Sequence, residues 1–386
     1  MKSTSRLFAY LAPVCSVCLL GSVLTASQAP PQETPRLAEQ YFKNVQALKG
    51  LPVDEFLDTM GMFSAATGLN CTDCHVDESG GSWERYADDN ALKIRSRQMI
   101  AMMTAINRQY FGGRQVVTCY SCHNGNRRPK FIPSLAVQYA VDPLIEAPYE
   151  ILEPTPGSPE PEVVLDRYLE AVGGATRLQE LTSFIARGQY TGFDDFEYFP
   201  VEVFAQAPNK RTTILHSQYG DVTTTFDGQS GWQATPIEMK PVPVMALTGG
   251  NLEGVALEAE LSFPGQVTQA LTDWVVGPLT VIDDREVRIV QGREASGAPV
   301  KLYFDQESGL LVRLVRYSSQ SPVGRVPTQV DFEDYREVDG IQFPFMWTST
   351  WTNGRTIHEL ESIEINPTIP ASRFARPVPP ARPAVP

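Results

Sequence analysis

The chain has 386 residues, a formal charge of -13 and 42% hydrophobic residues. This length allows two domains, and the apolar content is sufficient for packed cores. Basic and acidic side chains balance between residues 36 and 146, and the excess of acid lies downstream. Such a chain lacks the basic patches that nucleic acids require, so we expect no nucleic-acid partner.

The N-terminus has the pattern of an export signal. Lys2 and Arg6 precede a largely apolar stretch, Leu7 to Leu24, and small residues follow it. This pattern predicts a secretory signal peptide at residues 1–29. A membrane anchor is the alternative, although Pro13 and several small residues make a weak spanning segment. We therefore expect a periplasmic or secreted protein, with membrane association as the alternative.

Three helices are predicted after the signal. Apolar residues recur at helical spacing in residues 34–50, 52–68 and 89–111, which is the signature of amphipathic helices. The second of them ends at Gly68, a residue that commonly terminates a helix. The third is the longest.

A Cys-x-x-Cys-His motif follows each of the last two helices. The chain has only four histidines, so two such motifs are improbable by chance. This spacing is a signal for covalent haem attachment, because each thiol can add to one vinyl group while the next histidine lies beneath the iron. The motifs consist of Cys71, Cys74 and His75, and of Cys119, Cys122 and His123.

Other chemistries explain the motifs less well. Four thiolates could bind zinc, but that interpretation leaves both histidines unexplained. A redox dithiol needs only one pair, and a disulfide across two residues would be strained. We therefore predict two covalently bound haem c groups, with thioether bonds at the four cysteines and the two histidines as proximal iron ligands.

Each iron has one further coordination position, which methionine can fill. Five of the chain's nine methionines fall in the two helices that precede the motifs. Methionine on a helix face is usually a core residue, and two irons need only two sulfurs. The spacing leaves several candidates open: Met60 and Met62 on one helix, and Met99, Met102 and Met103 on the other.

The segments "MGMFSAATGLNCTDCH" and "RQMIAMMTAINRQYFGGRQVVTCYSCH" resemble the cytochrome c subunit of photosynthetic reaction centres. The resemblance covers residues 36–146. It implies Met60 and Met99 as distal iron ligands, because a methionine on the preceding helix is the usual sixth ligand in that family. The family's subunit carries four haems, so this chain, with two motifs, resembles half of it.

The downstream sequence changes character. Residues 147–161 are rich in proline and predict an extended linker. One helix and a broken second helix follow in residues 162–182, and period-two patterns from Phe184 onward predict an antiparallel sheet. Residues 373–386 predict a disordered, proline-rich tail.

The predicted β-rich domain, residues 162–372, carries a second and weaker resemblance. The segment "DRYLEAVGGATRLQELTSF" and the strands after it are similar to periplasmic lipoprotein-carrier half-barrels. In that family a curved sheet wraps a helix, which implies an apolar ligand for this domain. We expect this domain and the haem domain to have separate cores with few shared contacts.

The expected fold is therefore multidomain: an all-α multihaem cytochrome c domain followed by an antiparallel β-rich (α+β) half-barrel-like domain. The expected function is electron transfer with other redox proteins, without catalytic residues. Two alternatives remain: a lipid- or quinone-binding protein with redox or sensor haems, and a haem peroxidase.

Overall fold

The computed structural model describes residues 34–129, 132, 150–192, 198–320 and 324–380. The predicted signal peptide and the last residues of the predicted tail lie outside these ranges. The chain from Thr34 onward forms one compact unit. None of the described helices has the length and apolar character needed to cross a membrane.

The helical region, residues 34–129, carries both motifs. Its elements are α1 (Ala38–Tyr41), α2 (Val53–Thr67), α3 (Cys71–Cys74), the 3-10 helices η1 (Asp77–Gly81) and η2 (Trp83–Ala87), α4 (Ala91–Tyr110) and α5 (Cys119–His123). The second and third predicted helices are confirmed as α2 and α4. Gly68 ends α2 in the left-handed conformation, and the Asn90 side chain caps α4.

The first predicted helix is confirmed only in part, because only the four residues of α1 are helical within residues 34–50. The chain then turns through Asn44, which has a φ of 60°. The Asn44 amide donates to the carbonyl of Ala87 at 2.6 Å and to Asp89 at 2.9 Å. These polar contacts stabilise a loop where the apolar spacing suggested a helix. The region is helical only in part, so the all-α expectation is not confirmed.

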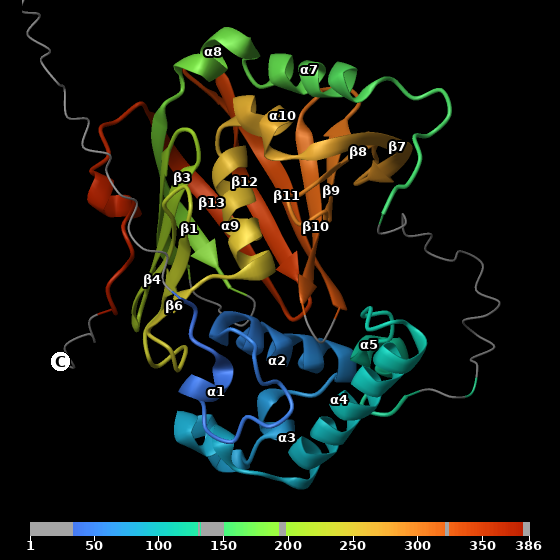
Figure 1. Ribbon diagram of the computed structural model, residues 1–386. Coiled ribbons are helices and arrows are strands. Elements are labelled where there is room, and N and C mark those ends of the chain that lie inside the picture. The colour runs from blue at the N-terminus through green and yellow to red at the C-terminus, as the bar shows by residue number, and fades with distance from the viewer. Residues whose placement is uncertain (1–33, 130–131, 133–149, 193–197, 321–323, 381–386) are drawn as a thin grey trace, which may run out of the picture. The chain divides into compact units, whose positions relative to one another are not determined.

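The sheet domain, residues 150–380, contains a thirteen-stranded antiparallel sheet among the described residues (Figure 1). The strand order is β6-β5-β4-β3-β2-β1-β13-β12-β11-β10-β9-β8-β7. The strands are β1 (Ser183–Thr191), β2 (Phe199–Gln206), β3 (Lys210–Ser217), β4 (Gly220–Phe226), β5 (Gly231–Ala234), β6 (Val244–Ala246), β7 (Thr272–Ile282), β8 (Arg285–Arg293), β9 (Pro299–Asp305), β10 (Leu311–Gln320), β11 (Gly324–Val338), β12 (Ile341–Trp351) and β13 (Gly354–Ile365). The predicted sheet is thus present.

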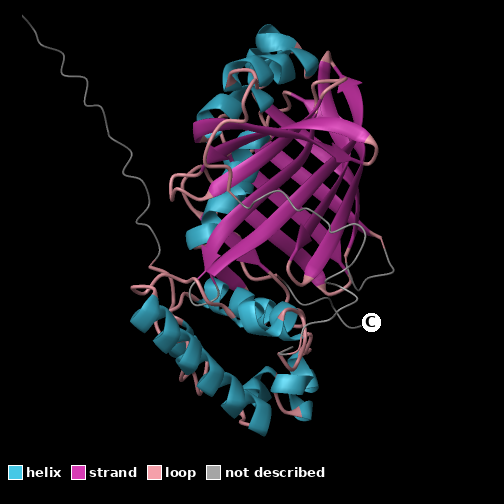
Figure 2. Ribbon diagram, turned by 90° about the vertical axis from the view of Figure 1, so that its right-hand side faces the viewer, coloured by secondary structure: helices cyan, strands magenta, loops and turns pink. Residues whose placement is uncertain are grey.

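Helices cover one face of this sheet (Figures 1 and 2). They are α7 (Pro161–Ala171), α8 (Gly174–Glu180), α9 (Gly249–Leu261) and α10 (Val267–Ala270), and the 3-10 helix η3 (Pro264–Gln266) packs among the last three. The 3-10 helix η4 (Ala371–Phe374) packs against β3. The break between α7 and α8 at Gly173-Gly174 is as predicted. Buried apolar residues of α7, α8, α9 and α10 form one core with those of the sheet.

Helix α9 was not predicted from the sequence. Two glycines bring it close to strand β10. A Cβ atom on Gly250 would lie 2.4 Å from the Cβ of Ser318, and one on Gly254 would lie 2.3 Å from the guanidinium of Arg316. Arg316 also donates to the Gly250 carbonyl at 2.9 Å. Glycine usually weakens a helix, and here it permits close packing on the sheet.

Parts of the predicted linker and tail are packed rather than extended into solvent. Ile151 is 7% exposed, and its backbone exchanges two hydrogen bonds with the Gln291 side chain, at 2.7 and 2.9 Å. Phe374 is 2% exposed and packs against Phe204 and Ile214. The described residues of segments 147–161 and 373–386 therefore include positions that belong to the sheet domain.

The helical region and the sheet domain share more contacts than the sequence led us to expect. The Trp83 indole donates to the Ile237 carbonyl at 2.8 Å, and the Tyr41 hydroxyl donates to the Pro241 carbonyl at 3.3 Å. Apolar contacts add to these bonds. They join Val53 to Val242 and Met245, and Met62 to Val326.

A buried carboxylate joins α2 to α9. Asp54 is 3% exposed and accepts hydrogen bonds from the Thr248 backbone at 2.6 Å and the Thr248 hydroxyl at 2.9 Å. Thr248 is the N-cap residue of α9, and its own side chain makes no cap bond. Asp54 thus supplies both an acceptor and a negative charge where the helix dipole favours them.

Replacing Asp54 with Ala should lower the free energy of unfolding by about 1–3 kcal/mol, because two donors at the start of α9 lose their buried acceptor. Chemical denaturation measures this loss. Asp166→Ala, on the exposed face of α7, is the matched control and should have a much smaller effect. Equal losses in the two variants would contradict the assigned role of Asp54.

Candidate haem sites

Each Cys-x-x-Cys-His motif forms one helical turn with the same capping pattern. Asn70 caps α3, accepting from the Asp73 backbone at 3.0 Å, while Asp73 accepts from the Asn70 backbone at 2.9 Å. Thr118 and Ser121 make the equivalent reciprocal bonds around α5, at 3.3 and 3.0 Å. These capping boxes satisfy otherwise unpaired donors and give both motifs the same local geometry.

No disulfide joins the four motif cysteines. Within a helical turn, residues three apart lie on one face, so Cys71 and Cys74 share a side of α3, and Cys119 and Cys122 share a side of α5. Two thiols on one face are what double attachment to a single haem requires. Among the described residues, no group of three or more Cys, His, Asp or Glu side chains is placed to hold a metal ion.

Both motif histidines use the same ring nitrogen in a hydrogen bond to the backbone. His75 Nδ1 lies 3.0 Å from the Tyr86 carbonyl oxygen, and His123 Nδ1 lies 2.9 Å from the Asn126 carbonyl oxygen. A carbonyl only accepts, so Nδ1 is the donor in each bond, and Nε2 is the ring nitrogen that this bond leaves for a metal. A ligating histidine in a metalloprotein is commonly oriented in this way.

The surroundings of His75 favour its neutral form. Burial lowers the pKa of His75, the Lys93 ammonium lowers it further, and the bond to Tyr86 opposes both effects. The centres of the His75 and Tyr86 rings lie 4.7 Å apart. The Trp83 ring packs in turn against Tyr86, with a centre-to-centre distance of 5.3 Å. These aromatic contacts fix the side chain that follows the first pair of cysteines.

The two helix-motif units are interleaved. Helix α2 packs against α5, and α3 packs against α4, so each motif turn contacts the long helix of the other unit. The Gly125 backbone donates to the Ala66 carbonyl at 2.9 Å, and a Cβ on Gly68 would lie 2.7 Å from the Gly125 carbonyl oxygen. Glycine at position 68 allows the ends of α2 and α5 to meet.

The candidate methionines of α2 point in different directions. Met62 is 7% exposed and packs against Val326 of the sheet domain. Met60 is half-buried and precedes Met62 by two residues, which is about 200° around a helix. Met60 therefore lies on the face of α2 that is turned away from Val326.

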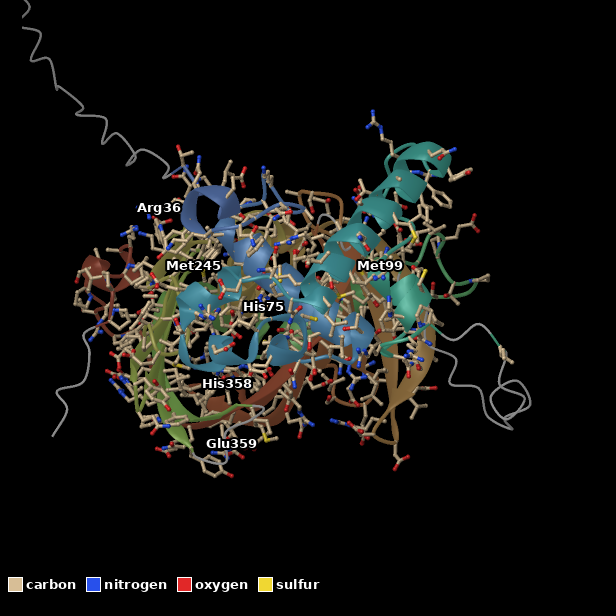
Figure 3. The ribbon with its side chains drawn as sticks, turned by 90° about the horizontal axis from the view of Figure 1, so that it is seen from below. Arg36, His75, Met99, Met245, His358 and Glu359 are labelled. Carbon is tan, nitrogen blue, oxygen red and sulfur yellow. The ribbon has the colours of Figure 1, made fainter. Side chains whose placement is uncertain are left out.

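The candidate methionines of α4 also differ. Met103 is 4% exposed, in a buried stripe with Ile100 and Asn107, whereas Met102 is 48% exposed. Met99 is half-buried and lies one turn before Met103 on the same side of the helix. Figure 3 labels Met99 on α4 and His75 near the centre of the helical region.

Large apolar side chains remain exposed on α4 and around the second motif. A flat apolar group held at the motifs would remove part of this surface from water. The exposed side chains are Ile94, Met102, Tyr110, Val116 and Tyr120.

Asn107 is a buried residue of this region that the sequence did not reveal. It is 2% exposed and binds the loop that leads to Cys119. Its Nδ2 donates to the Val117 carbonyl at 2.6 Å, and its Oδ1 accepts from the backbones of Val116 and Val117 at 3.2 and 2.9 Å. Asn107 is a polar residue at a position of α4 where the helical spacing expects an apolar one, and this mismatch could have identified it from the sequence.

Asn107→Ala should lower the free energy of unfolding by about 1–3 kcal/mol, since three loop groups lose their partner. It should also increase amide hydrogen exchange in residues 115–118. Gln109→Ala, at an exposed position of the same helix, is the control. Unchanged exchange in this loop would contradict the role given to Asn107.

Comparison with known proteins agrees with the motif pattern. Residues 19–141 match the family described as photosynthetic reaction centre cytochrome C subunit. The photosynthetic reaction center cytochrome c subunit of Thermochromatium tepidum is 37% identical over 98 residues, which cover 24% of this chain and 23% of that protein. The subunit of Rubrivivax gelatinosus is 35% identical over 127 residues, 29% of this chain and 33% of that protein. The chain thus spans about a quarter to a third of these relatives.

The sheet domain has similar solved structures. One is a putative outer membrane lipoprotein-sorting protein domain from Vibrio parahaemolyticus, with 12% identity, a TM-score of 0.39 and coverage of 55% of this chain and 96% of that one. Another is a LolA superfamily protein from Nitrosomonas europaea, with 11% identity, a TM-score of 0.37 and the same coverage.

The resemblance to the reaction-centre cytochrome c subunit is confirmed for the N-terminal part of the chain.

Proposed function

We propose that this chain is a periplasmic dihaem c-type cytochrome that transfers electrons between other redox proteins. The observation that carries the proposal is the pair of identically capped motif turns. In each of them, the histidine donates Nδ1–H to a backbone carbonyl and leaves Nε2 available. The match of residues 19–141 to the reaction-centre cytochrome subunit supports the same chemistry.

The residues at each motif fit a haem c group. Cys71 and Cys74 would hold one haem through thioether bonds, and Cys119 and Cys122 would hold the other. His75 and His123 would ligate the two irons from the proximal side. Haem iron supplies reversible one-electron chemistry when it is bound. The role of the protein would be to hold the iron ligands in place, to limit the access of water to the haem, and to expose a haem edge to a redox partner.

Met60 and Met99 are the proposed distal ligands. Packing against Val326 commits Met62 to the sheet domain and leaves Met60 on the other side of α2. On α4, Met102 is largely exposed and Met103 lies within the buried stripe. Met99 is half-buried on the core side of α4, so it can reach a ligand in the interior without leaving a packed position.

A ligand set of histidine and methionine suits an electron carrier. Both side chains can stay bound in either oxidation state, so little reorganisation accompanies electron transfer. Export to the periplasm accords with the predicted signal at residues 1–29, since c-type attachment motifs and export signals occur together in such proteins. The partners are expected to be other redox proteins.

The purified full-length protein should carry two haems that remain attached after denaturation in acidic organic solvent. Cys71→Ala with Cys74→Ala should remove one haem, and Cys119→Ala with Cys122→Ala should remove the other. Haem content per chain, measured by pyridine haemochrome absorption and intact mass, tests this expectation. A chain without covalent haem after maturation in a host that attaches haem c would overturn the proposal.

Met60→Leu should convert one haem from low-spin to high-spin or water ligation and lower its reduction potential, because the thioether ligand is lost. Electron paramagnetic resonance and the sulfur-to-iron charge-transfer absorption band would follow this change. Met62→Leu is the matched control on the same helix and should leave both irons low-spin. Met99→Leu and Met103→Leu form the corresponding pair on α4.

The opposite outcome on either helix would reassign its ligand without changing the proposed function. Loss of a low-spin iron in Met62→Leu or Met103→Leu, with Met60→Leu and Met99→Leu unaffected, would move the ligand to the neighbouring methionine. A native ferric spectrum with one high-spin haem would instead favour a peroxidase. Co-purification of an apolar molecule would favour a binding protein.

A further inference from the structure

The carbonyl that orients His75 has a second donor. Tyr86 O accepts from His75 Nδ1 at 3.0 Å and from Lys93 Nζ at 2.7 Å. Lys93 also donates to the Asp88 carbonyl at 2.9 Å, and its side chain is only 15% exposed. The ammonium group is thus held against the backbone that carries the proximal hydrogen bond.

A small charged cluster surrounds this contact. Asp89 lies 3.6 Å from the Lys93 ammonium and 2.8 Å from the Arg97 guanidinium. The Lys93 and Arg97 side chains are both largely buried, at 15% and 17% exposed, and Asp89 is 35% exposed. Among these three residues, two cations and one anion leave one net positive charge, and the neighbouring Asp88 is paired with Arg85 at 2.9 Å.

The second motif lacks the equivalent arrangement. His123 Nδ1 donates to Asn126 O at 2.9 Å. Within the described ranges, no lysine or arginine donates to that carbonyl. The two motif turns have the same capping and the same histidine-to-carbonyl hydrogen bond, so the cation on the acceptor is one of the differences between the two sites.

We propose that Lys93 is a positioning residue that selectively raises the reduction potential of the haem at His75. This inference rests on the proposed function, since it requires a haem at that histidine. Lys93 acts through the Tyr86 carbonyl and through space, without touching the iron.

Two physical effects act in the same direction. An ammonium bound to Tyr86 O withdraws electron density from that oxygen, which makes it a weaker acceptor for His75 Nδ1–H. The imidazole then has less anionic character and stabilises ferric iron less. In addition, a nearby positive charge disfavours the oxidised iron, which carries one more positive charge than the reduced iron. Limited exposure reduces the screening of this charge by salt.

Spectroelectrochemical titration of the full-length holoprotein tests the inference. Lys93→Gln should lower the reduction potential of one of the two haems by about 59 mV. At a fixed potential, the ratio of reduced to oxidised haem in that redox wave should then fall about tenfold. The other wave should stay in place. Proton NMR should show altered hyperfine-shifted resonances for one axial histidine only. Lys93→Arg should retain most of the wild-type potential, because it keeps a cation at this position.

Two further variants control the result. Arg95→Gln removes the same charge from an exposed position on α4 and should move neither wave appreciably. Asp89→Asn removes the counter-charge and should move the same wave as Lys93→Gln, but upward.

Equal shifts of both waves, or no shift in Lys93→Gln, would overturn the inference and leave the proposed function intact. If Lys93→Gln does not incorporate haem, Asp89→Asn provides the test. A higher reduction potential for one haem supports the inference, and unchanged potentials for both haems contradict it. A wild-type protein without covalent haem would overturn the proposed function itself.

Discussion

The bond between Asp54 and Thr248 is the constraint on which the arrangement of the described chain depends. It places a carboxylate from α2 at the start of α9, the helix that covers the sheet. Residues nearly 200 positions apart thereby satisfy one another's polar groups inside a buried contact. An uncompensated carboxylate or helix terminus at this depth would be costly. The helical region and the sheet domain therefore stabilise each other, and the sheet domain is part of the environment in which the motif-bearing helices fold.

Local chemistry explains why the motif region could be anticipated in some detail. Cysteine spacing and Gly68 after α2 are short-range features, and the structure places them where the sequence predicts. The polar caps before the motifs, Asn70 and Thr118, are also local, but they were recognised only in the structure. The proximal hydrogen bonds are different in kind. Tyr86 is eleven residues from His75 and lies within the second 3-10 helix after it, whereas Asn126 is three residues from His123. Two motifs that look alike in sequence thus obtain the same bond by unrelated loop conformations.

Long-range packing accounts for what the sequence did not reveal. Helix α9 contains Gly250 and Gly254, which argue against a helix when only local propensity is considered. Their advantage becomes visible only when Ser318 and Arg316 of β10 lie opposite. Residues 34–50 show the reverse case, because their helical spacing is overridden by the contacts of Asn44. Likewise, the choice between Met60 and Met62 depends on Val326, which is more than 260 residues away.

Helix α2 connects the proposed iron site to the sheet domain. It is a single helix of fifteen residues, Val53–Thr67, about 22 Å long at 1.5 Å per residue. Asp54 and Met62 bind it to the sheet domain, while the proposed ligand Met60 occupies a different face. Because α2 has no internal break, its faces move together as one rigid body. The position of the Met60 sulfur is therefore set in part by contacts with α9 and β11, so a domain without any haem motif can help to define the geometry of the proposed iron site.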